Sequence, residues 1–196
     1  MNYYTAYGLT LKSELELPEL SEIEFSSSAD LTIRLGELND ELENSTKRNT
    51  WQFNDDFLQF NFPGVLKVLI KRDGTEMILE SLGQDGFQLR SFLYSRAFSA
   101  ILFCRGFFLL HGACIEIKGK AYAFIGPSGV GKSTLTMGLM RKGYKILSDD
   151  VVALKFEQEQ FWAYPGFNRL RLTEDTLEKM GIGDGDFSLI DHYPTK

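Results

Sequence analysis

The sequence predicts an α/β fold, with a small β-rich domain over residues 1–87 and an α/β domain with a phosphate-loop core over residues 88–196. Short stretches that alternate apolar and polar residues dominate the first part, as in half-buried strands. In the second part, a glycine-rich loop at 126–134 joins an apolar stretch to a stretch with helical spacing. Two adjacent aspartates directly follow the next apolar stretch. This order is typical of an α/β nucleotide-binding core.

The composition is that of an ordinary globular protein, with 43% hydrophobic and 24% charged residues. A formal net charge of -6 leaves no basic surplus to neutralise nucleic-acid phosphates, so we expect no nucleic-acid partner. Cys104 and Cys114 both lie in apolar stretches. They could pair with each other, but we expect buried thiols in a reducing compartment. The start lacks a signal-peptide pattern, and the apolar stretch 97–110 is too short to span a bilayer. We therefore expect a cytoplasmic protein without a membrane partner.

The first domain is predicted to be a meander of short strands whose aromatic residues belong to the core. A short extended piece ends at Leu15-Glu16-Leu17-Pro18. Further strands are predicted at 31–35, 51–53, 57–62, 65–70 and 77–79. Turn signals stand at Asn54-Asp55-Asp56, Pro63-Gly64 and Asp73-Gly74. No catalytic pattern stands out in this domain, and an exposed sheet edge would suit peptide docking.

The second domain begins with a helical pattern from Leu89 to Arg105, which Gly106 is expected to end. Strands are predicted at 107–111, 114–117 and 121–125, with a hairpin turn at 118–120 between the last two. The helix that follows the glycine-rich loop is expected to end at Gly143. Two more strands are predicted, at 144–147 and 151–154.

The glycine-rich loop has the pattern of a phosphate-binding loop, in the run Gly126-Pro127-Ser128-Gly129-Val130-Gly131-Lys132-Ser133-Thr134. Glycines let the backbone approach phosphate oxygens, and successive N–H groups at a helix start attract an anion. Lys132 is expected to reach the β- and γ-phosphates, and the Ser133 hydroxyl to hold Mg²⁺. The alternative is a glycine-rich turn that matches by chance. Because a strand precedes the loop and a helix follows it, we expect ATP and Mg²⁺ as cofactors.

The adjacent carboxylates Asp149 and Asp150 are the candidate acid–base and metal groups. Mg²⁺ needs a hard oxygen ligand beside the serine hydroxyl, and a kinase needs a carboxylate that takes the acceptor's proton. Side chains of adjacent residues leave an extended backbone on opposite sides, so the pair could divide these two roles. The alternative is a solvated turn or a cap. The position after the strand that follows the loop helix favours function.

Three other features leave the choice between a structural and a functional role open. His111 closes an apolar strand and is either a hydrogen-bonded core residue or a participant in the site. Arg169 and Arg171 alternate with leucines and could form a solvated strand face or a clamp on an anion. Thr173-Glu174-Asp175 is interpreted as the start of a capped helix, and His192 is assigned no role.

The second domain resembles the catalytic domain of HPr kinase/phosphorylase. The residues that carry the resemblance are Leu110-His111-Gly112, the run from Phe124 to Ser133 and the run from Gly143 to Asp150. The opening Tyr7-Gly8-Leu9, together with Leu17-Pro18-Glu19-Leu20, is similar to a smaller group of HPr-kinase-like proteins. Some members of that group accompany lasso-peptide clusters and phosphorylate a serine near the end of the precursor peptide.

The resemblance implies a phosphate-loop fold related to phosphoenolpyruvate carboxykinase, with ATP, Mg²⁺ and a serine hydroxyl as the acceptor. It implies that Asp149 is the general base, that Asp150 supports the metal and that His111 sits near the transferred phosphate. Thr134 stands where bifunctional members usually carry an acidic residue, which argues against phosphorylase activity and against HPr as the substrate. The family normally continues beyond Lys196 with further basic active-site residues, so we expect the visible catalytic set to be incomplete.

The sequence thus predicts an ATP-dependent kinase whose partner is a peptide or protein with an acceptor serine, such as the C-terminal serine of a lasso-peptide precursor. One alternative is a kinase for an amino acid, nucleoside or sugar, which a mass shift on a metabolite would reveal. The other is a nucleotide-sensing module, which would bind ATP without transfer to any acceptor. A homo-oligomer is compatible with the sequence, which leaves the oligomeric state open.

Overall fold

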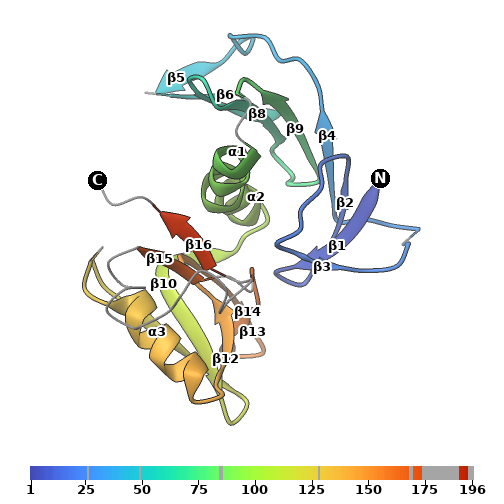
Figure 1. Cartoon of the computed structure of the whole chain (residues 1–196). Helices are drawn as coiled ribbons and strands as arrows, with labels where there is room; N and C mark the ends of the chain where they lie inside the picture. The colour runs from blue at the N-terminus through green and yellow to red at the C-terminus, as the bar shows by residue number, and fades with distance from the viewer. Residues whose placement is uncertain are drawn as a thin grey trace. The chain divides into compact units, whose positions relative to one another are not determined.

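The computed structural model describes residues 1–25, 27–48, 50–83, 86–127, 129–167, 170–173 and 190–193 (Figure 1). The chain divides into two compact units, Met1–Phe107 and Phe108–Lys196. The sequence predicted this boundary after residue 87 instead. The structure places the helical segment with the first unit, because its side chains contact that unit's strands. The rings of Phe92 and Phe62, for example, lie 4.3 Å apart between centroids.

Within its described residues, the first unit forms one nine-stranded sheet, in the order β3-β1-β2-β4-β9-β8-β7-β6-β5. The strands are β1 (Asn2–Ala6), β2 (Leu9–Ser13), β3 (Ser21–Glu22), β4 (Leu31–Leu35), β5 (Thr46–Arg48), β6 (Trp51–Phe53), β7 (Phe57–Phe62), β8 (Leu66–Lys71) and β9 (Glu76–Ser81). The predicted strands from residue 31 onward are confirmed to within one or two residues at each end. The extended piece that was predicted to end at Leu15-Glu16-Leu17-Pro18 ends earlier, because β2 stops at Ser13.

The sequence predicted a meander, but the sheet is not a pure meander. β4 pairs in parallel with both β2 and β9, and the other neighbours are antiparallel. A parallel pair needs a long connection between its strands, and the polar segment 36–45 begins the excursion from β4 to β5. Its backbone is held by side chains of the sheet, such as Gln52, whose Nε2 donates to the Asp40 carbonyl at 2.7 Å.

Three consecutive helical segments complete the first unit: α1 (Gly86–Phe92), the π-helix η1 (Leu93–Ala97) and α2 (Phe98–Cys104). The predicted helix is confirmed, and Gly106 ends it with a φ of 76°. Figure 1 shows the sheet curving around these helices. Alternate residues of β8 and β9 are buried, as period-2 strands require, and so are the helical residues that follow a three-and-four spacing. The most deeply buried of these are Leu66, Val68, Ile70, Met77, Leu79, Leu93, Ala97, Phe98, Ile101 and Leu102.

The β8–β9 hairpin turns at Asp73-Gly74, as the sequence predicted, and hydrogen bonds and charge at Asp73 stabilise the turn. Asp73 accepts from the Thr75 hydroxyl at 2.6 Å and pairs with Lys71 at 2.8 Å. The Lys71 ammonium, followed by Thr75, lowers the pKa of Asp73 from 3.8 to about 2. A carboxyl with a lowered pKa stabilises the fold above its ordinary pKa, and this contribution is lost as the pH falls through the lowered value.

Asp73→Asn should therefore destabilise the protein at neutral pH, and its deficit should shrink as the pH falls from about 4 to about 2. The effect is small because the pair is exposed to solvent and salt. Urea unfolding of wild type and variant at several pH values measures the deficit. A deficit that does not change over this interval would contradict the charge-based account of the turn.

The second unit has a five-stranded sheet within its described residues, in which β11, β10, β13 and β14 are successive neighbours and β12 also pairs with β10. Its elements are β10 (Phe108–Ile117), β11 (Lys120–Ile125), α3 (Lys132–Arg141), β12 (Lys145–Ser148), β13 (Val151–Glu157) and β14 (Gln160–Tyr164). β15 (Leu170–Thr173) and β16 (Ile190–Tyr193) pair in parallel as a separate ribbon. The α/β character expected from the sequence is confirmed.

The long strand β10 organises the second unit. The sequence predicted two strands here, at 107–111 and 114–117, but Gly112 and Ala113 continue the ladder without a break. The first half of β10 pairs with β13 and the second half with β11 and β12. Since β11 and β12 are both antiparallel to β10, they run in the same direction, and α3 is the crossover between them. This crossover carries the glycine-rich loop at the end of β11.

No helix among the described residues has both the length and the apolar character that crossing a membrane requires.

Candidate active site

The loop between β11 and α3 adopts a conformation that depends on its glycines. Gly129 and Gly131 have φ values of 83° and 95°, in the left-handed region that side chains with a Cβ rarely adopt. Gly131 is also the N-cap of α3, and its carbonyl accepts from the Leu135 N–H at 2.9 Å. Nothing lies within 4 Å of the place where a Cβ would stand on either glycine. The loop is thus open on that side and leads directly into a helix N-terminus, the arrangement that binds anions.

Lys132 starts α3 and folds back over the loop. Its Nζ donates to the Gly126 carbonyl at 2.8 Å and to the Pro127 carbonyl at 3.0 Å. An ammonium group has three N–H donors, so one remains to point at a ligand. The side chain is half-buried, and its contacts hold a positive charge at the mouth of the loop.

Ser133, the next residue, faces the first of the two aspartates. Its hydroxyl lies 3.2 Å from Oδ1 and 3.4 Å from Oδ2 of Asp149. Both side chains are half-buried. Asp149 follows β12, so the two ends of the crossover meet here, as the sequence predicted. Thr136, which donates to the Lys132 carbonyl at 2.9 Å, fixes the first turn of the helix that presents Ser133.

His111 faces the second aspartate. Its Nδ1 lies 3.2 Å from the Asp150 carbonyl oxygen and 3.2 Å from Asp150 Oδ1. Both partners are acceptors, so these contacts suit a ring that carries a proton on Nδ1. Asp150 has a φ of 75°, which is uncommon outside glycine and carries strain of about 1–3 kcal/mol. Its carbonyl also accepts from the Gly112 N–H at 3.2 Å. Two neighbouring residues of β10, His111 and Gly112, therefore hold the backbone bend at Asp150.

Gly112 permits the close approach of β10 to β11 just before the loop. A Cβ on this residue would stand 2.5 Å from the Phe124 carbonyl oxygen and 3.3 Å from its carbonyl carbon. Neither atom belongs to a flexible side chain, so the two strands would have to move apart. This explains in steric terms why a glycine follows His111.

Gly112→Ala should destabilise the protein by about 1–3 kcal/mol, the range for forcing extra volume into a packed site. It should also weaken nucleotide binding, because β11 carries the loop. Gly138→Ala is the matched control: nothing lies within 4 Å of its added methyl group, and alanine favours a helix over glycine by about 1 kcal/mol. In urea unfolding, Gly112→Ala should be less stable than wild type and Gly138→Ala slightly more stable. Nucleotide titration should show weaker binding for Gly112→Ala only. A Gly112→Ala variant as stable as Gly138→Ala would contradict the strand contact.

The described residues fit a site in which the protein supplies only some of the ligands of a metal ion and the substrate supplies others. No group of three or more His, Cys, Asp and Glu side chains gathers among them in a way that could hold a metal alone. In phosphate-transferring enzymes Mg²⁺ is usually bound by one or two protein oxygens together with phosphate oxygens and water. The adjacent Ser133 hydroxyl and Asp149 carboxylate provide that partial set of hard oxygens.

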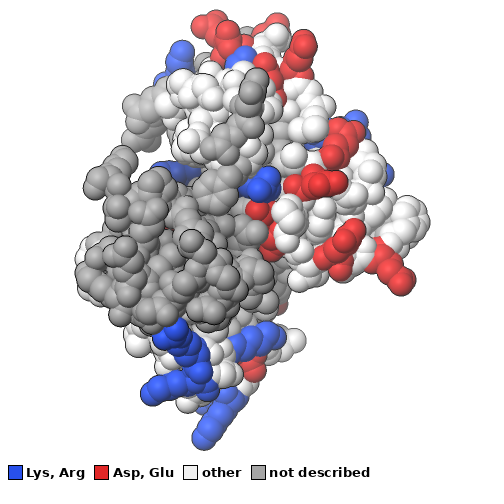
Figure 2. Space-filling view, in the orientation of Figure 1, with Lys and Arg blue, Asp and Glu red and all other residues white. Residues whose placement is uncertain are grey.

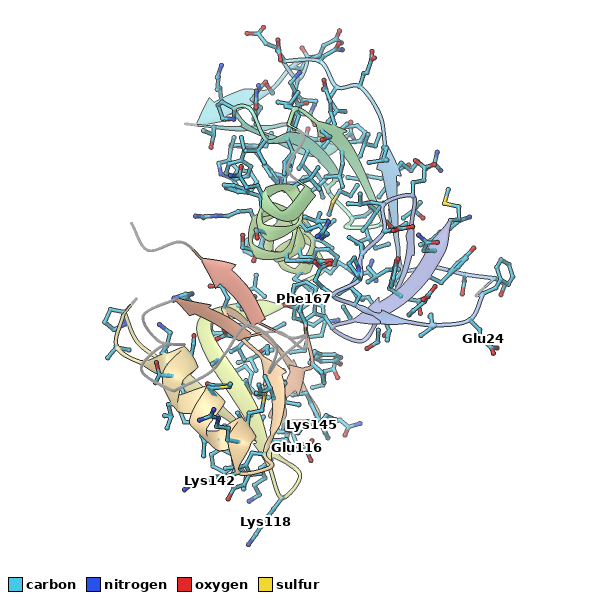
Figure 3. All side chains as sticks on the ribbon, viewed as in Figure 1. Glu24, Glu116, Lys118, Lys142, Lys145 and Phe167 are labelled. Atoms are coloured by element: carbon cyan, nitrogen blue, oxygen red, sulfur yellow. The ribbon has the colours of Figure 1, made fainter. Side chains whose placement is uncertain are left out.

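The charges of the chain are unevenly distributed between the units. Residues 1–107 contain ten basic and sixteen acidic residues, and residues 108–196 contain eleven of each, so the first unit carries the net charge of -6. Figure 2 shows acidic side chains gathered over the first unit and basic side chains at one end of the second. Figure 3 labels Lys118, Lys142 and Lys145 at that end. An anionic nucleotide meets a less repulsive field at the second unit.

The structure brings most of the candidate residues into one connected set. Lys132 and Ser133 are adjacent, Ser133 contacts Asp149, and Asp150 contacts His111. Gly126, Gly129, Val130 and Gly131 belong to the loop beside them, and Thr134 is exposed in the first turn of α3. Ser128 and Arg169, the side chain of Arg171 and the helix expected after Thr173 lie outside the described residues.

Residues 107–187 match the family model described as the HPr Serine kinase C-terminal domain. This match supports an HPr-kinase-like identity for the region. Over 77 residues the chain is 36% identical to HPr kinase/phosphorylase 1 of Oceanobacillus iheyensis, covering 39% of this chain and 24% of that protein. It is 32% identical over 74 residues to HPr kinase/phosphorylase of Bacillus subtilis, covering 38% and 23% of the two chains. The chain therefore spans about a quarter of the length of these relatives.

Sequence reasoning missed two features of the second unit. It gave no role to Gly112 itself, although a glycine inside a strand pattern signals close backbone approach. It also did not foresee that Asp150, through its positive φ, would hold His111 with both its carbonyl and its carboxylate. An aspartate directly after another polar residue at a strand end is a weak signal for such a bend.

Proposed function

We propose that the chain is an ATP-dependent kinase that transfers the γ-phosphoryl group to a serine hydroxyl of a peptide or protein. The observation that carries the proposal is the connected set Lys132, Ser133, Asp149, Asp150 and His111 beside a glycine loop at a helix N-terminus. The match of residues 107–187 to the HPr Serine kinase C-terminal domain model supports the serine acceptor. The lasso-peptide precursor remains the proposed substrate suggested by the opening segment.

In the proposed reaction the acceptor hydroxyl oxygen bonds to the γ-phosphorus while the bond to the β–γ bridging oxygen breaks. Asp149 takes the hydroxyl proton, and ADP leaves with the bridging oxygen. The third N–H of Lys132 and the loop N–H groups orient the phosphates. His111, held by Asp150, lies near the transferred group. Mg²⁺, when bound by Ser133 and an aspartate, neutralises phosphate charge. Asp149 lies close enough to Ser133 to contribute to that site as well, with Asp150 as support.

Intact-mass spectrometry tests the proposal. The full-length protein is incubated with Mg²⁺ and ATP and with peptides that end in serine, alongside free serine and HPr. A mass increase of one phosphoryl group on a serine peptide supports it. An increase on free serine or on another metabolite would favour a small-molecule kinase. ATP binding without transfer to any acceptor would favour a nucleotide sensor, and either result would overturn the peptide kinase.

Lys132→Ala should abolish detectable transfer and weaken ATP binding at least about tenfold, because it removes the charge that contacts the phosphates. Lys142→Ala is the control, since Lys142 is an exposed basic residue at the other end of α3 (Figure 3). Isothermal titration with ATP and the mass assay give the two readouts. Equal ATP affinity in the two variants would remove Lys132 from the binding site.

A further inference from the structure

The first unit contains a groove with a volume of about 540 Å³ that is partly open to solvent. This volume lies within the usual range for ligand sites, about 300–1,000 Å³. Helical residues of η1 and α2 form one wall, and residues of β6, β7 and the β8–β9 turn form the other. All of its lining residues belong to Met1–Phe107, so it is distinct from the site around the glycine loop.

Two arginines, Arg72 and Arg96, line this groove from opposite walls. Both are exposed, and neither guanidinium has an ion pair or hydrogen bond with another residue that the structure describes. Other basic side chains of the same unit are paired, such as Arg34 with Glu76 and Arg105 with Asp30. On a unit with sixteen acidic residues, two unpaired guanidinium groups in one groove make a local site for an anion.

The rest of the groove is mainly apolar and partly rigid. Trp51 lies on the wall with its ring 4.5 Å from that of Phe60, which is fully buried, so the indole is fixed before any ligand binds. Phe103 is 73% exposed on the groove, and Leu58 is half-buried there. Rigid aromatic side chains with exposed area are typical anchors for a protein or peptide partner.

The π-helix η1 determines which polar groups reach the groove. Ser95, in η1, donates its hydroxyl to the Ser91 carbonyl at 2.8 Å, and Ser99 donates to the Ser95 carbonyl at 2.7 Å. These hydroxyls are satisfied within the helix, which leaves the guanidinium of Arg96 as the charged group from this wall. Short π-helical segments inside longer helices often occur at functional sites.

We propose that this groove binds a peptide segment that places a carboxylate beside an aromatic or aliphatic side chain. The carboxylate meets Arg72 and Arg96, and the apolar side chain packs on Trp51, Leu58 and Phe103. A small inorganic anion would leave the apolar walls uncovered, and two guanidinium groups are too few to neutralise the run of phosphates along a nucleic acid. We also infer that this peptide is the part of the acceptor that anchors it to the kinase. This second step rests on the proposed function, whereas the binding of the peptide to the groove does not.

Fluorescence anisotropy with the full-length protein tests the binding, without ATP. The probe is a fluorescein-labelled heptapeptide that alternates phenylalanine or leucine with glutamate. Two comparison peptides replace glutamate with lysine, or the apolar residues with serine. The variant Arg72→Gln/Arg96→Gln is compared with Arg34→Gln, which removes one charge from an exposed ion pair outside the groove. Thermal unfolding checks that all variants fold.

The acidic apolar peptide should bind at least about tenfold more tightly than either comparison peptide, and the double variant should lose this margin while Arg34→Gln keeps it. Binding of equal strength to the lysine peptide, or an unchanged affinity in the double variant, would overturn the proposal. So would displacement of the probe by millimolar inorganic phosphate alone, because the apolar contacts would then be irrelevant. These results do not depend on phosphoryl transfer, so a failed docking site and a failed kinase assignment are distinguishable.

Discussion

Asp149→Asn should lower phosphoryl transfer to the acceptor by about 10²- to 10⁴-fold, the usual contribution of a general base. The amide has nearly the shape of the carboxylate and can still accept the Ser133 hydrogen bond, which spans 3.2 Å in the wild type. It cannot take the acceptor's proton, and it is a poorer ligand for Mg²⁺. The change should therefore affect the chemical step far more than the fold.

The measurement is the rate of phosphopeptide formation by intact-mass spectrometry, together with ATP affinity and thermal unfolding. Glu116→Gln is the matched control, because Glu116 is an exposed carboxylate of the same unit whose only described ion pair is a 3.9 Å contact with Lys145 (Figure 3). Asp150→Asn separates the two aspartates: it keeps the Asp150 carbonyl that holds His111, so its loss should be smaller. Equal losses in the two aspartate variants would argue against Asp149 as the base.

The local pattern was enough to predict much of the second unit. The β11–loop–α3 order follows from residues whose preferences agree with the final structure: an apolar run, glycines that need positive φ, and a helical spacing after Lys132. The contacts between Ser133 and Asp149 were also predictable, because a strand–helix–strand crossover brings the loop and the end of the second strand to one side of the sheet. These are short-range features.

Long-range pairing could not be predicted in the same way. Nothing in residues 31–35 indicates that this strand lies in parallel between β2 and β9, because alternation gives the buried face but not the neighbour. The break predicted between 111 and 114 was wrong, because Gly112 continues the strand at a point of close approach to Phe124. The helical segment was predicted, but an apolar face does not reveal which sheet covers it, so the domain boundary was displaced.

Glu19→Ala should destabilise the protein by about 3 kcal/mol, the largest stability effect that we expect from a single change in the first unit. The Glu19 side chain is only 1% exposed, its Oε1 lies 2.8 Å from Arg90 Nε, and its Oε2 accepts from the Tyr94 hydroxyl at 2.5 Å. This carboxylate connects the segment after β2 to α1 and η1. Removing it leaves a buried phenol and a largely buried guanidinium without their partner, which costs more than the pair itself contributes.

Urea unfolding compares Glu19→Ala with Arg34→Ala, which breaks an ion pair between side chains that are 57% and 36% exposed. The exposed pair should contribute less than about 1 kcal/mol, so the two variants separate burial from charge. Glu19→Gln keeps an acceptor for Tyr94 and should fall between them. If Glu19→Ala is no less stable than Arg34→Ala, the cluster does not hold the helices to the sheet. Arg96, two residues after Tyr94 in η1, lines the groove. A loosened cluster should therefore also weaken peptide binding there, which connects the stability of this unit to its proposed docking role.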